Sequence, residues 1–419
     1  MSADRERPAL PEGLRQELQR LGLRRGREIE PPVRRPYVPP AVPALDGRLV
    51  DTGEGTCFVV EERYPLDYRH GHLPLGALLE EPVVHWAALA GGDAWPDLAP
   101  PGLAFLDIET TGLADSAATY AFLVGLGRFE GASFRLYQAF MRSPFEERAL
   151  LRTVADLFAG VAGLVTYNGR GFDLPVLYSR YTVARLPIPW EGCAHLDLLL
   201  PMRRFFRARL GSCSLANVEQ AMLGVERSLL DVPGWRIPSV YRDYVRGADP
   251  AVLKPVFYHN AQDVLSLAVL AAYLGRYLRD PFGAGGARHG LEFCALGRFY
   301  EQCGQIEQAI AAYRAALLLA MPVSFREEAW RRMSFLLKRQ HAWAEAVEIW
   351  EALLERPAGT PLYAYVELAK YYEHRAGDLA RAAVRVEQAI ARWGERPGGE
   401  DLLRRRERLR KKRKIAREE

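Results

Sequence analysis

The feature that most constrains the fold is a change of pattern near residue 290. Residues 101–280 alternate apolar strand-like runs with amphipathic helical segments, whereas residues 290–393 contain only helical patterns. Alternation of this kind predicts a mixed α/β domain with a sheet flanked by helices, and the helical stretch predicts a separate all-α domain. A length of 419 residues is also too great for one ordinary core. Three adjacent strands are predicted by LAFLDIET, AFLVGLGRFE and SFRLYQAFM, and a long helix by LKPVFYHNAQDVLSLAVLAAYLGRYL.

The helical part, residues 290–393, contains a repeat of about 36 residues. Each copy places a small residue where paired helices must approach closely, as at Ala309, Ala346 and Ala382. The pattern resembles the tetratricopeptide repeat, degenerate in its second and third copies. Such repeats more often bind a peptide or protein partner than nucleic acid. We expect the tryptophans of this region in the core of the stack, with base stacking as the alternative; they are Trp330, Trp343 and Trp350.

Three segments flank these two domains. Residues 1–45 are rich in Pro and Arg and are predicted to be disordered, apart from a possible short helix over Leu14–Leu23. Residues 46–100 are predicted to form a small extension that packs on the α/β domain and includes a strand at CFVVEE. Residues 394–419 form a basic tail, which either holds phosphates or is a solvated helix end.

Composition excludes several classes of protein. The five cysteines are scattered, which argues against a disulfide framework or a zinc site. The sequence has no apolar run of the roughly 18 residues that a membrane span requires and no apolar core for a secretory signal, so a cytoplasmic location is expected. His70 and His72 point the same way on an extended chain and could ligate a metal, but a structural role is the favoured interpretation.

Two carboxylates stand at the end of an apolar strand in FLDIETTGL. Asp107 and Glu109 are two positions apart, so they face the same way along a strand. Their mutual repulsion is costly unless a cation lies between them, and oxygen ligands suit Mg²⁺ or Mn²⁺. The following Thr110, Thr111 and Gly112 turn the chain and open space for a phosphate. The alternative is a strand that ends in exposed acids.

Two more acidic residues come later in the chain. In YNGRGFDLP, Asp173 starts a predicted helix and is either a helix cap or a ligand, while Asn168 could orient a water or a phosphate oxygen. In FYHNAQDVL, Asp263 lies among apolar residues of the long helix, where a charge needs a partner. No Lys or Arg lies one turn away on either side, so we expect a metal as that partner.

DIETTGL, YNGRGFDLP and YHNAQDV, in this order, resemble conserved segments of DEDD-type 3′–5′ exonucleases of the ribonuclease H-like superfamily. The whole arrangement, with repeats after such a domain, resembles the bacterial YprB-like proteins. The resemblance implies a ribonuclease H-like domain over residues 101–280. It also implies two divalent ions, Mg²⁺ or Mn²⁺, held by Asp107, Glu109, Asp173 and Asp263.

The last segment departs from the pattern of these enzymes. One DEDD subgroup has Tyr four residues before the last Asp and the other has His five before, whereas here His259 is at minus four and Tyr258 at minus five. Helical geometry puts His259 on the face of Asp263, so His259 is the favoured general base and Tyr258 the alternative. Asp197 resembles another recurring Asp, for which we expect a structural role.

These observations predict a nuclease that hydrolyses single-stranded DNA or RNA, as a 3′–5′ exonuclease or as an endonuclease of the same superfamily. The alternative is a weak or inactive nucleic-acid-binding scaffold whose repeats bind a protein. The segment MRRFFRARLGS interleaves cations with aromatics and is either a phosphate contact or a solvated helix face. The residues expected to bind substrate are Thr110, Thr111, Gly112, Leu113, Asn168, Arg203, Arg204 and Arg207.

Overall fold

The computed structural model describes residues 12, 42, 45–81, 89, 99–112, 119–228, 231–356, 361–394 and 399–418. The chain divides into two compact units, residues 1–41 and 42–419. The short helix expected at Leu14–Leu23, most of the Pro-rich segment and Leu113 lie outside the described residues. The second unit contains both the α/β domain and the C-terminal helical region.

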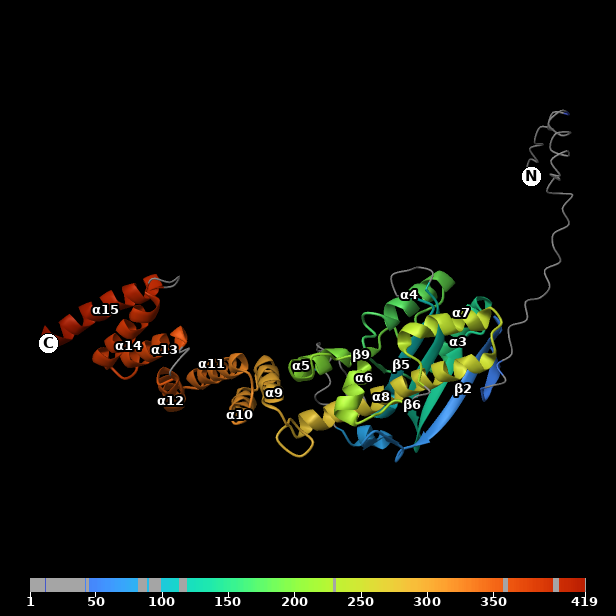
Figure 1. Ribbon diagram of the computed structural model, residues 1–419, viewed down its shortest axis with the longest axis horizontal. Coiled ribbons are helices and arrows are strands. Elements are labelled where there is room, and N and C mark those ends of the chain that lie inside the picture. The colour runs from blue at the N-terminus through green and yellow to red at the C-terminus, as the bar shows by residue number, and fades with distance from the viewer. Residues whose placement is uncertain are drawn as a thin grey trace. The chain divides into compact units, whose positions relative to one another are not determined.

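A seven-stranded mixed sheet forms the centre of the α/β domain, in the order β1-β2-β7-β6-β5-β8-β9 (Figure 1). Strands β5, β6 and β7 are antiparallel neighbours, as the sequence predicted, and β8 and β9 extend the sheet in parallel from β5. The segment 46–100 contributes β1 and β2 to the sheet itself. The strands are β1 Gly47–Asp51, β2 Thr56–Pro65, β5 Leu103–Thr110, β6 Ala121–Glu130, β7 Ser133–Phe140, β8 Gly163–Thr166 and β9 Ala194–Asp197.

Helices cover both faces of this sheet. Side chains alternate along β5, so Phe105 joins a core with α5 and most of α8, while Leu106 joins a second core with α3, α4 and α7. Asp107 and Glu109 continue the Phe105 face, toward α8. The helices of this domain are α3 Glu147–Leu157, α4 Asp173–Ala184, α5 Leu199–Leu210, α6 Leu215–Val218, α7 Ile237–Val245 and α8 Lys254–Arg279, with a π-helical turn at Glu219–Leu223.

The two histidines of the N-terminal extension bind separate protein groups. His70 lies in β3 (Arg69–His70), which pairs with β4 (Leu73–Pro74). His70 is buried with Nε2 2.6 Å from the Ser266 hydroxyl, and His72 Nδ1 lies 2.7 Å from the carbonyl oxygen of Leu223. Burial lowers the pKa of His70 to about 4. Each ring therefore fastens the extension to the domain, which supports the structural interpretation.

Among the described residues, the first six helices after the α/β domain pack as consecutive pairs. Ala309, Ala346 and Ala382 are fully buried, as the repeat predicted. Gly297 allows one close approach, because a Cβ there would lie 2.5 Å from the Tyr313 ring. Among the described residues, no helix is long and apolar enough to span a membrane. The pairs are α9 Gly290–Gln302 with α10 Ile306–Leu317, α11 Val323–Arg339 with α12 Trp343–Leu354, and α13 Leu362–His374 with α14 Leu379–Trp393.

The basic tail is a packed helix, α15 Gly399–Glu418. Its Leu402 and Leu409 are buried, and it contacts α14. Three of its cations, Arg405, Arg408 and Lys412, surround the buried carboxylate of Glu373 at 2.7–3.1 Å. The pKa of Glu373 falls to about 2 despite its burial, because these cations stabilise its charge. These three cations of the basic segment therefore stabilise the fold by binding a buried carboxylate.

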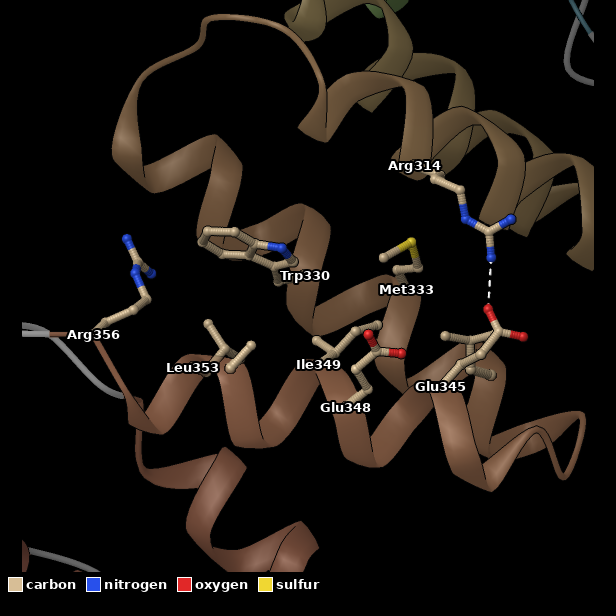
Figure 2. Close-up of a pocket in the computed structure, with 10 residues that line it drawn as sticks. Arg314, Trp330, Met333, Glu345, Glu348, Ile349, Leu353 and Arg356 are labelled. Atoms are coloured by element: carbon tan, nitrogen blue, oxygen red, sulfur yellow. Dashed lines mark hydrogen bonds and ion pairs between the residues drawn. The ribbon is translucent and has the colours of Figure 1, made fainter.

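The tryptophans of the helical pairs lie in two kinds of environment. Trp350 is fully buried, as predicted. Trp330 lines a cavity of about 430 Å³ between α11 and α12 (Figure 2). The guanidinium of Arg356 stacks 4.6 Å from the centre of the Trp330 ring. Trp330 is thus only partly buried and forms one side of this cavity.

Candidate active site

Four carboxylates gather where β5 meets α4 and α8. Glu109 and Asp173 are 9% and 5% exposed, and Asp173 accepts a hydrogen bond from the Ile108 backbone N–H at 3.3 Å. Burial raises the pKa of Asp107 and Glu109 well above the ordinary range, and the neighbouring charges of Asp173 and Asp263 raise it further. Burial likewise raises the pKa of Asp173 to about 7. The four acids predicted from three separate motifs are therefore close enough to repel one another strongly.

Asp107 is held in place by a buried amide chain that the sequence interpretation missed. Asn260 Nδ2 donates to Asp107 Oδ2 at 2.8 Å, and Asn260 Oδ1 accepts from Gln138 Nε2 at 2.9 Å. Gln138 also donates to the carbonyl oxygen of Phe257 at 2.8 Å. Gly125 lies opposite Asp107 on β6, and a Cβ there would lie 2.2 Å from Asn260 Oδ1. The glycine leaves the space that this amide occupies.

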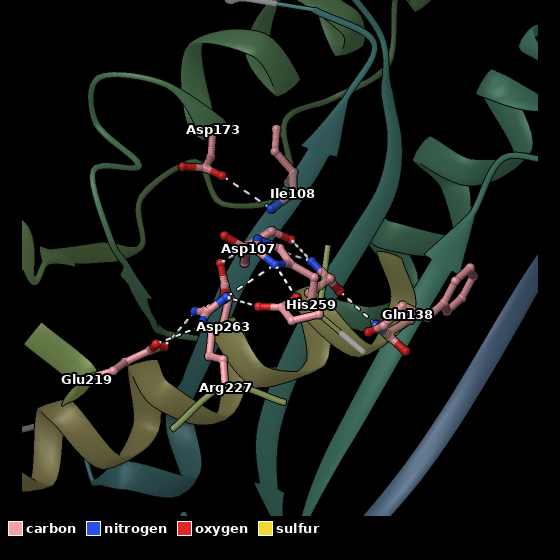
Figure 3. A network of polar contacts seen from close by, with 11 residues as sticks. Asp107, Ile108, Gln138, Asp173, Glu219, Arg227, His259 and Asp263 are labelled. Carbon is pink, nitrogen blue, oxygen red and sulfur yellow. Dashed lines mark hydrogen bonds and ion pairs between the residues drawn. The ribbon is translucent and has the colours of Figure 1, made fainter. Parts of the chain in front are cut away.

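Asp263 has a cationic partner within the chain, contrary to our expectation. Arg227, which is 36 residues away in sequence, donates through Nη2 to Asp263 (Figure 3). Its Nε and Nη2 also donate to the two oxygens of the buried Glu219, both at 2.8 Å. Its Nη1 lies 3.3 Å from Asp231 Oδ2. The inference that Asp263 lacks a cationic partner within the chain was wrong, because it considered only neighbours along one helix and not the loop that carries Arg227; Asp263 as a metal ligand stays a prediction.

His259 belongs to the same network. Its Nδ1 lies 2.8 Å from Asp231 Oδ1, and its Nε2 lies 3.6 Å from Asp263 Oδ2. Tyr258 precedes it by one residue, which rotates its side chain by about 100° around α8, and it takes no part in the network that the described residues form. The geometry therefore brings His259 to the carboxylates. Asp231 was not singled out from the sequence, and its spacing to His259 carries no motif-like signal.

The loop after β8 is organised by Asp197. This buried carboxylate accepts hydrogen bonds from the backbone N–H groups of Asn168, Arg170 and Leu199, at 2.7, 3.1 and 3.1 Å. Asn168 has a left-handed backbone with φ of 62°, which Asn tolerates better than most residues. Asp197 thus has the structural role that we expected.

The turn after β5 is closed by its own hydroxyls. Thr110 Oγ1 donates to the carbonyl oxygen of Gly112 at 2.7 Å, and Thr111 Oγ1 accepts from the Tyr120 N–H at 3.0 Å. The expected substrate contacts of Thr110, Thr111 and Gly112 remain a prediction.

The four carboxylates are chemically suited to bind a divalent ion, although their side chains do not surround a common point. In the part of the chain that the structure describes, no three Asp, Glu, His or Cys side chains form a ready metal group. Arg227 occupies one oxygen of Asp263, and so acts as a stand-in cation. All four candidate ligands offer hard oxygen atoms, which Mg²⁺ and Mn²⁺ prefer, and burial together with mutual repulsion raises the pKa values of Asp107, Glu109 and Asp173.

Comparison with known proteins identifies the family. Residues 104–275, which include all four carboxylates, match the RNase_H superfamily model. A Bacillus subtilis (strain 168) protein named YprB is 31% identical over 339 residues, covering 80% of each chain. The chain belongs to the YprB family. Since the match to YprB spans most of both chains, YprB-family membership extends beyond the ribonuclease H-like domain.

One solved structure with some similarity to this YprB-family chain is the family B DNA polymerase from the hyperthermophilic archaeon Pyrobaculum calidifontis. It is 18% identical with a TM-score of 0.36, and the match covers 61% of this chain and 33% of the polymerase. A likeness this weak supports no argument about function.

Proposed function

We propose that this YprB-family chain is a metal-dependent nuclease that hydrolyses phosphodiester bonds of single-stranded DNA or RNA, as a 3′–5′ exonuclease. The observation that carries the proposal is the buried cluster of four carboxylates from β5, α4 and α8, inside a ribonuclease H-superfamily domain. Buried like charges with raised pKa values destabilise a fold, so their presence together favours a role in binding cations and substrate.

Each group of the cluster has a role in this reaction. Asp107, Glu109, Asp173 and Asp263 would hold two Mg²⁺ or Mn²⁺ ions, which when bound supply an activated water and stabilise the leaving oxygen. Asn260 fixes the orientation of Asp107.

His259 takes the proton of the attacking water through Nε2. Asp231 accepts a hydrogen bond from Nδ1–H and so fixes the tautomer in which Nε2 carries the lone pair. With Nδ1 protonated, the nearby Arg227 Nη1 cannot donate to it and donates to Asp231 instead.

The test uses the purified full chain, Mn²⁺, and 5′-labelled single strands of DNA and RNA. We expect products that shorten progressively from the 3′ end, and no cleavage by Asp107→Ala. A circular single strand separates exonuclease from endonuclease action, because only an endonuclease cuts it. No cleavage by the wild type, or equal cleavage by Asp107→Ala, would refute the proposal.

The identity of the base is tested in the same assay. His259→Ala is expected to lower kcat by roughly 10²- to 10⁴-fold, and Tyr258→Phe to leave it within about threefold of the wild type, since Tyr258 lies outside the polar network. The reverse order of effects would assign the role to Tyr258.

A second candidate is an inactive scaffold that binds nucleic acid through the domain and a protein through the helical pairs. The ion pair between Arg227 and Asp263 favours it, because the guanidinium engages a carboxylate oxygen that a metal ion would need. Calorimetry with Mn²⁺ discriminates: tight binding that is lost in Asp263→Asn supports the nuclease, and no binding by the wild type supports the scaffold.

A further inference from the structure

We propose that a cavity between the β8 loop and α5 binds consecutive backbone phosphates of a single-stranded polynucleotide. We call it the basic cavity. It has a volume of about 550 Å³, and its polar lining residues are Tyr167, Asn168, Arg203, Arg207, Ser212 and Ser214. The inference rests on the proposed function, since it names how that site holds its substrate.

The positive charge of the basic cavity comes from one face of α5. Arg203 and Arg207 are four residues apart, so they lie on the same side of the helix, separated by a rise of about 6 Å. Both are exposed, and no ion pair with a carboxylate engages either one within the described residues. Both arginines are close enough to affect Cys213, which also lines the cavity. Burial raises the pKa of the Cys213 thiol, and the positive charges of the two arginines oppose that rise.

The other arginines of α5 have different partners. Arg204 lies over the Phe299 ring, 5.7 Å from its centre, and Arg209 Nε lies 2.5 Å from Glu292 Oε1. Both face α9. The sequence placed Arg203, Arg204 and Arg207 together as substrate contacts, but the structure brings only Arg203 and Arg207 to the cavity. Arg204 is therefore a matched control with the same charge on the same helix.

The basic cavity adjoins the carboxylate cluster through Asp197. This residue accepts the N–H of Asn168, which lines the cavity. The carbonyl oxygen of Asn168 in turn accepts the N–H of Phe172 at 3.1 Å, the residue directly before Asp173 of the cluster. The strands that carry the two sites, β8 and β5, are parallel neighbours. A strand whose terminal phosphodiester lies at the carboxylates would therefore pass its next phosphates along α5.

The lining favours the backbone over the bases. Guanidinium groups and hydroxyls are donors suited to phosphate oxygens, and such contacts carry no sequence information. The aromatic side chain in the lining, Tyr167, is half-buried and its hydroxyl already donates to the carbonyl oxygen of Cys213 at 2.7 Å. We therefore expect binding that is insensitive to sequence and sensitive to salt.

The experiment measures binding of fluorescein-labelled dT15 and U15 by anisotropy, with the full chain in EDTA, between 50 and 300 mM KCl. The arginine double variant Arg203→Ala/Arg207→Ala should bind at least tenfold more weakly at 100 mM KCl. The slope of log affinity against log salt should become shallower by about 1.4, because each lost single-strand phosphate contact removes roughly 0.7. Arg204→Ala should change neither quantity. The two oligonucleotides show whether the sugar affects binding.

Three results would overturn the assignment: no binding of either oligonucleotide by the wild type at 50 mM KCl, an unchanged slope in the double variant, or an equal loss in Arg204→Ala. An equal melting temperature of wild type and double variant confirms that the fold is intact, and Arg203→Lys/Arg207→Lys should recover most of the slope. Because no metal is present, the result is independent of cleavage. A chain that binds in this way and never cleaves with Mn²⁺ refutes the proposed chemistry and leaves the basic cavity supported.

Discussion

Arg227 gives the carboxylate cluster a positive charge of its own. Glu219 holds its guanidinium through two parallel contacts, so the planar group is fixed before it reaches Asp263 and Asp231. Side-chain exposures of 16% for Arg227 and 1% for Glu219 place this pair inside the protein. A buried pair of this kind is costly to break from one side, since the remaining charge is left without a partner.

Replacing Arg227 by Gln should have opposite effects on stability and on metal affinity. Without metal, Glu219 and Asp263 lose their cation, and we expect a loss of roughly 3–5 kcal/mol in the free energy of unfolding. The more negative cluster should bind Mn²⁺ several-fold more tightly than the wild type. Urea denaturation in EDTA and calorimetry with Mn²⁺ measure the two quantities. Weaker Mn²⁺ binding by Arg227→Gln would mean that the guanidinium does not compete with the ion.

The raised pKa of Asp173 predicts how stability depends on pH. Its pKa rises from 3.8 to about 7 on folding, so the native state binds a proton more tightly than the unfolded chain between those values. In EDTA, the free energy of unfolding should therefore fall as pH rises from about 4 to 7, and the raised pKa values of Asp107 and Glu109 act in the same direction. Asp173→Asn, which stays neutral, should flatten this decline.

Mn²⁺ should reverse the trend, because it binds the deprotonated acids and stabilises the protein most at pH 8. Denaturation curves at pH 5, 6.5 and 8 test both statements. A metal-free protein that gains stability over this range would contradict the raised pKa.

The candidate site could be predicted from the sequence only in part. Asp107, Glu109, Asp173 and Asp263 each stand in a compact motif, and the i, i+4 spacing was enough to favour His259 over Tyr258. Arg227, Asp231 and Gln138 could not be found, because each reaches the cluster from a loop or a strand far away in sequence. Their contacts with the cluster depend on the tertiary fold, which a local sequence pattern does not predict.

At the scale of elements, the close approach of α8 to β6 positions the site, and Gly125 permits it. Gly125→Ala should displace the Asn260 amide that holds Asp107 and lower the proposed nuclease activity and Mn²⁺ affinity. Gly127→Ala is the matched control, since a Cβ there would lie 2.3 Å from Phe134 and 2.7 Å from Val264, both apolar. Both variants should lose roughly 1–3 kcal/mol of stability through overpacking. If both reduce Mn²⁺ affinity equally, the amide chain does not support the site.

Element prediction succeeded where periodicity was strong. The strands of 101–140, the long helix α8 and the helical pairs were predicted directly from their apolar spacing. The joining of β1 and β2 to the main sheet was not, because strand pairing over long separations depends on register and not on composition. The packing of α15 was also missed, since its two buried leucines are outnumbered by cations.

At the scale of the whole molecule, α5 joins the α/β domain to the helical pairs. Phe205 packs against Phe299 of α9 with ring centres 5.4 Å apart, and Glu292 of α9 is 3% exposed beside Arg209. A chain that ends at Arg288 should therefore melt at a lower temperature, at a cost of roughly 1.5–3 kcal/mol for each large aromatic residue exposed. A chain that ends at Glu355 keeps α9–α12 and is the control. Equal melting temperatures of the two would show that the helical pairs do not support the domain.

The two faces of α5 also have a consequence for communication between distant parts of the chain. One face carries Arg203 and Arg207, and the opposite face rests on α9. A partner protein that shifts α9 on binding would move α5, and with it the two guanidinium groups, relative to the carboxylate cluster, and would thereby alter the affinity for a polynucleotide. Thermodynamic linkage then requires the polynucleotide to change the affinity for that partner by the same factor. This factor can be measured in two ways: as the change in polynucleotide affinity caused by the partner, or as the change in partner affinity caused by the polynucleotide.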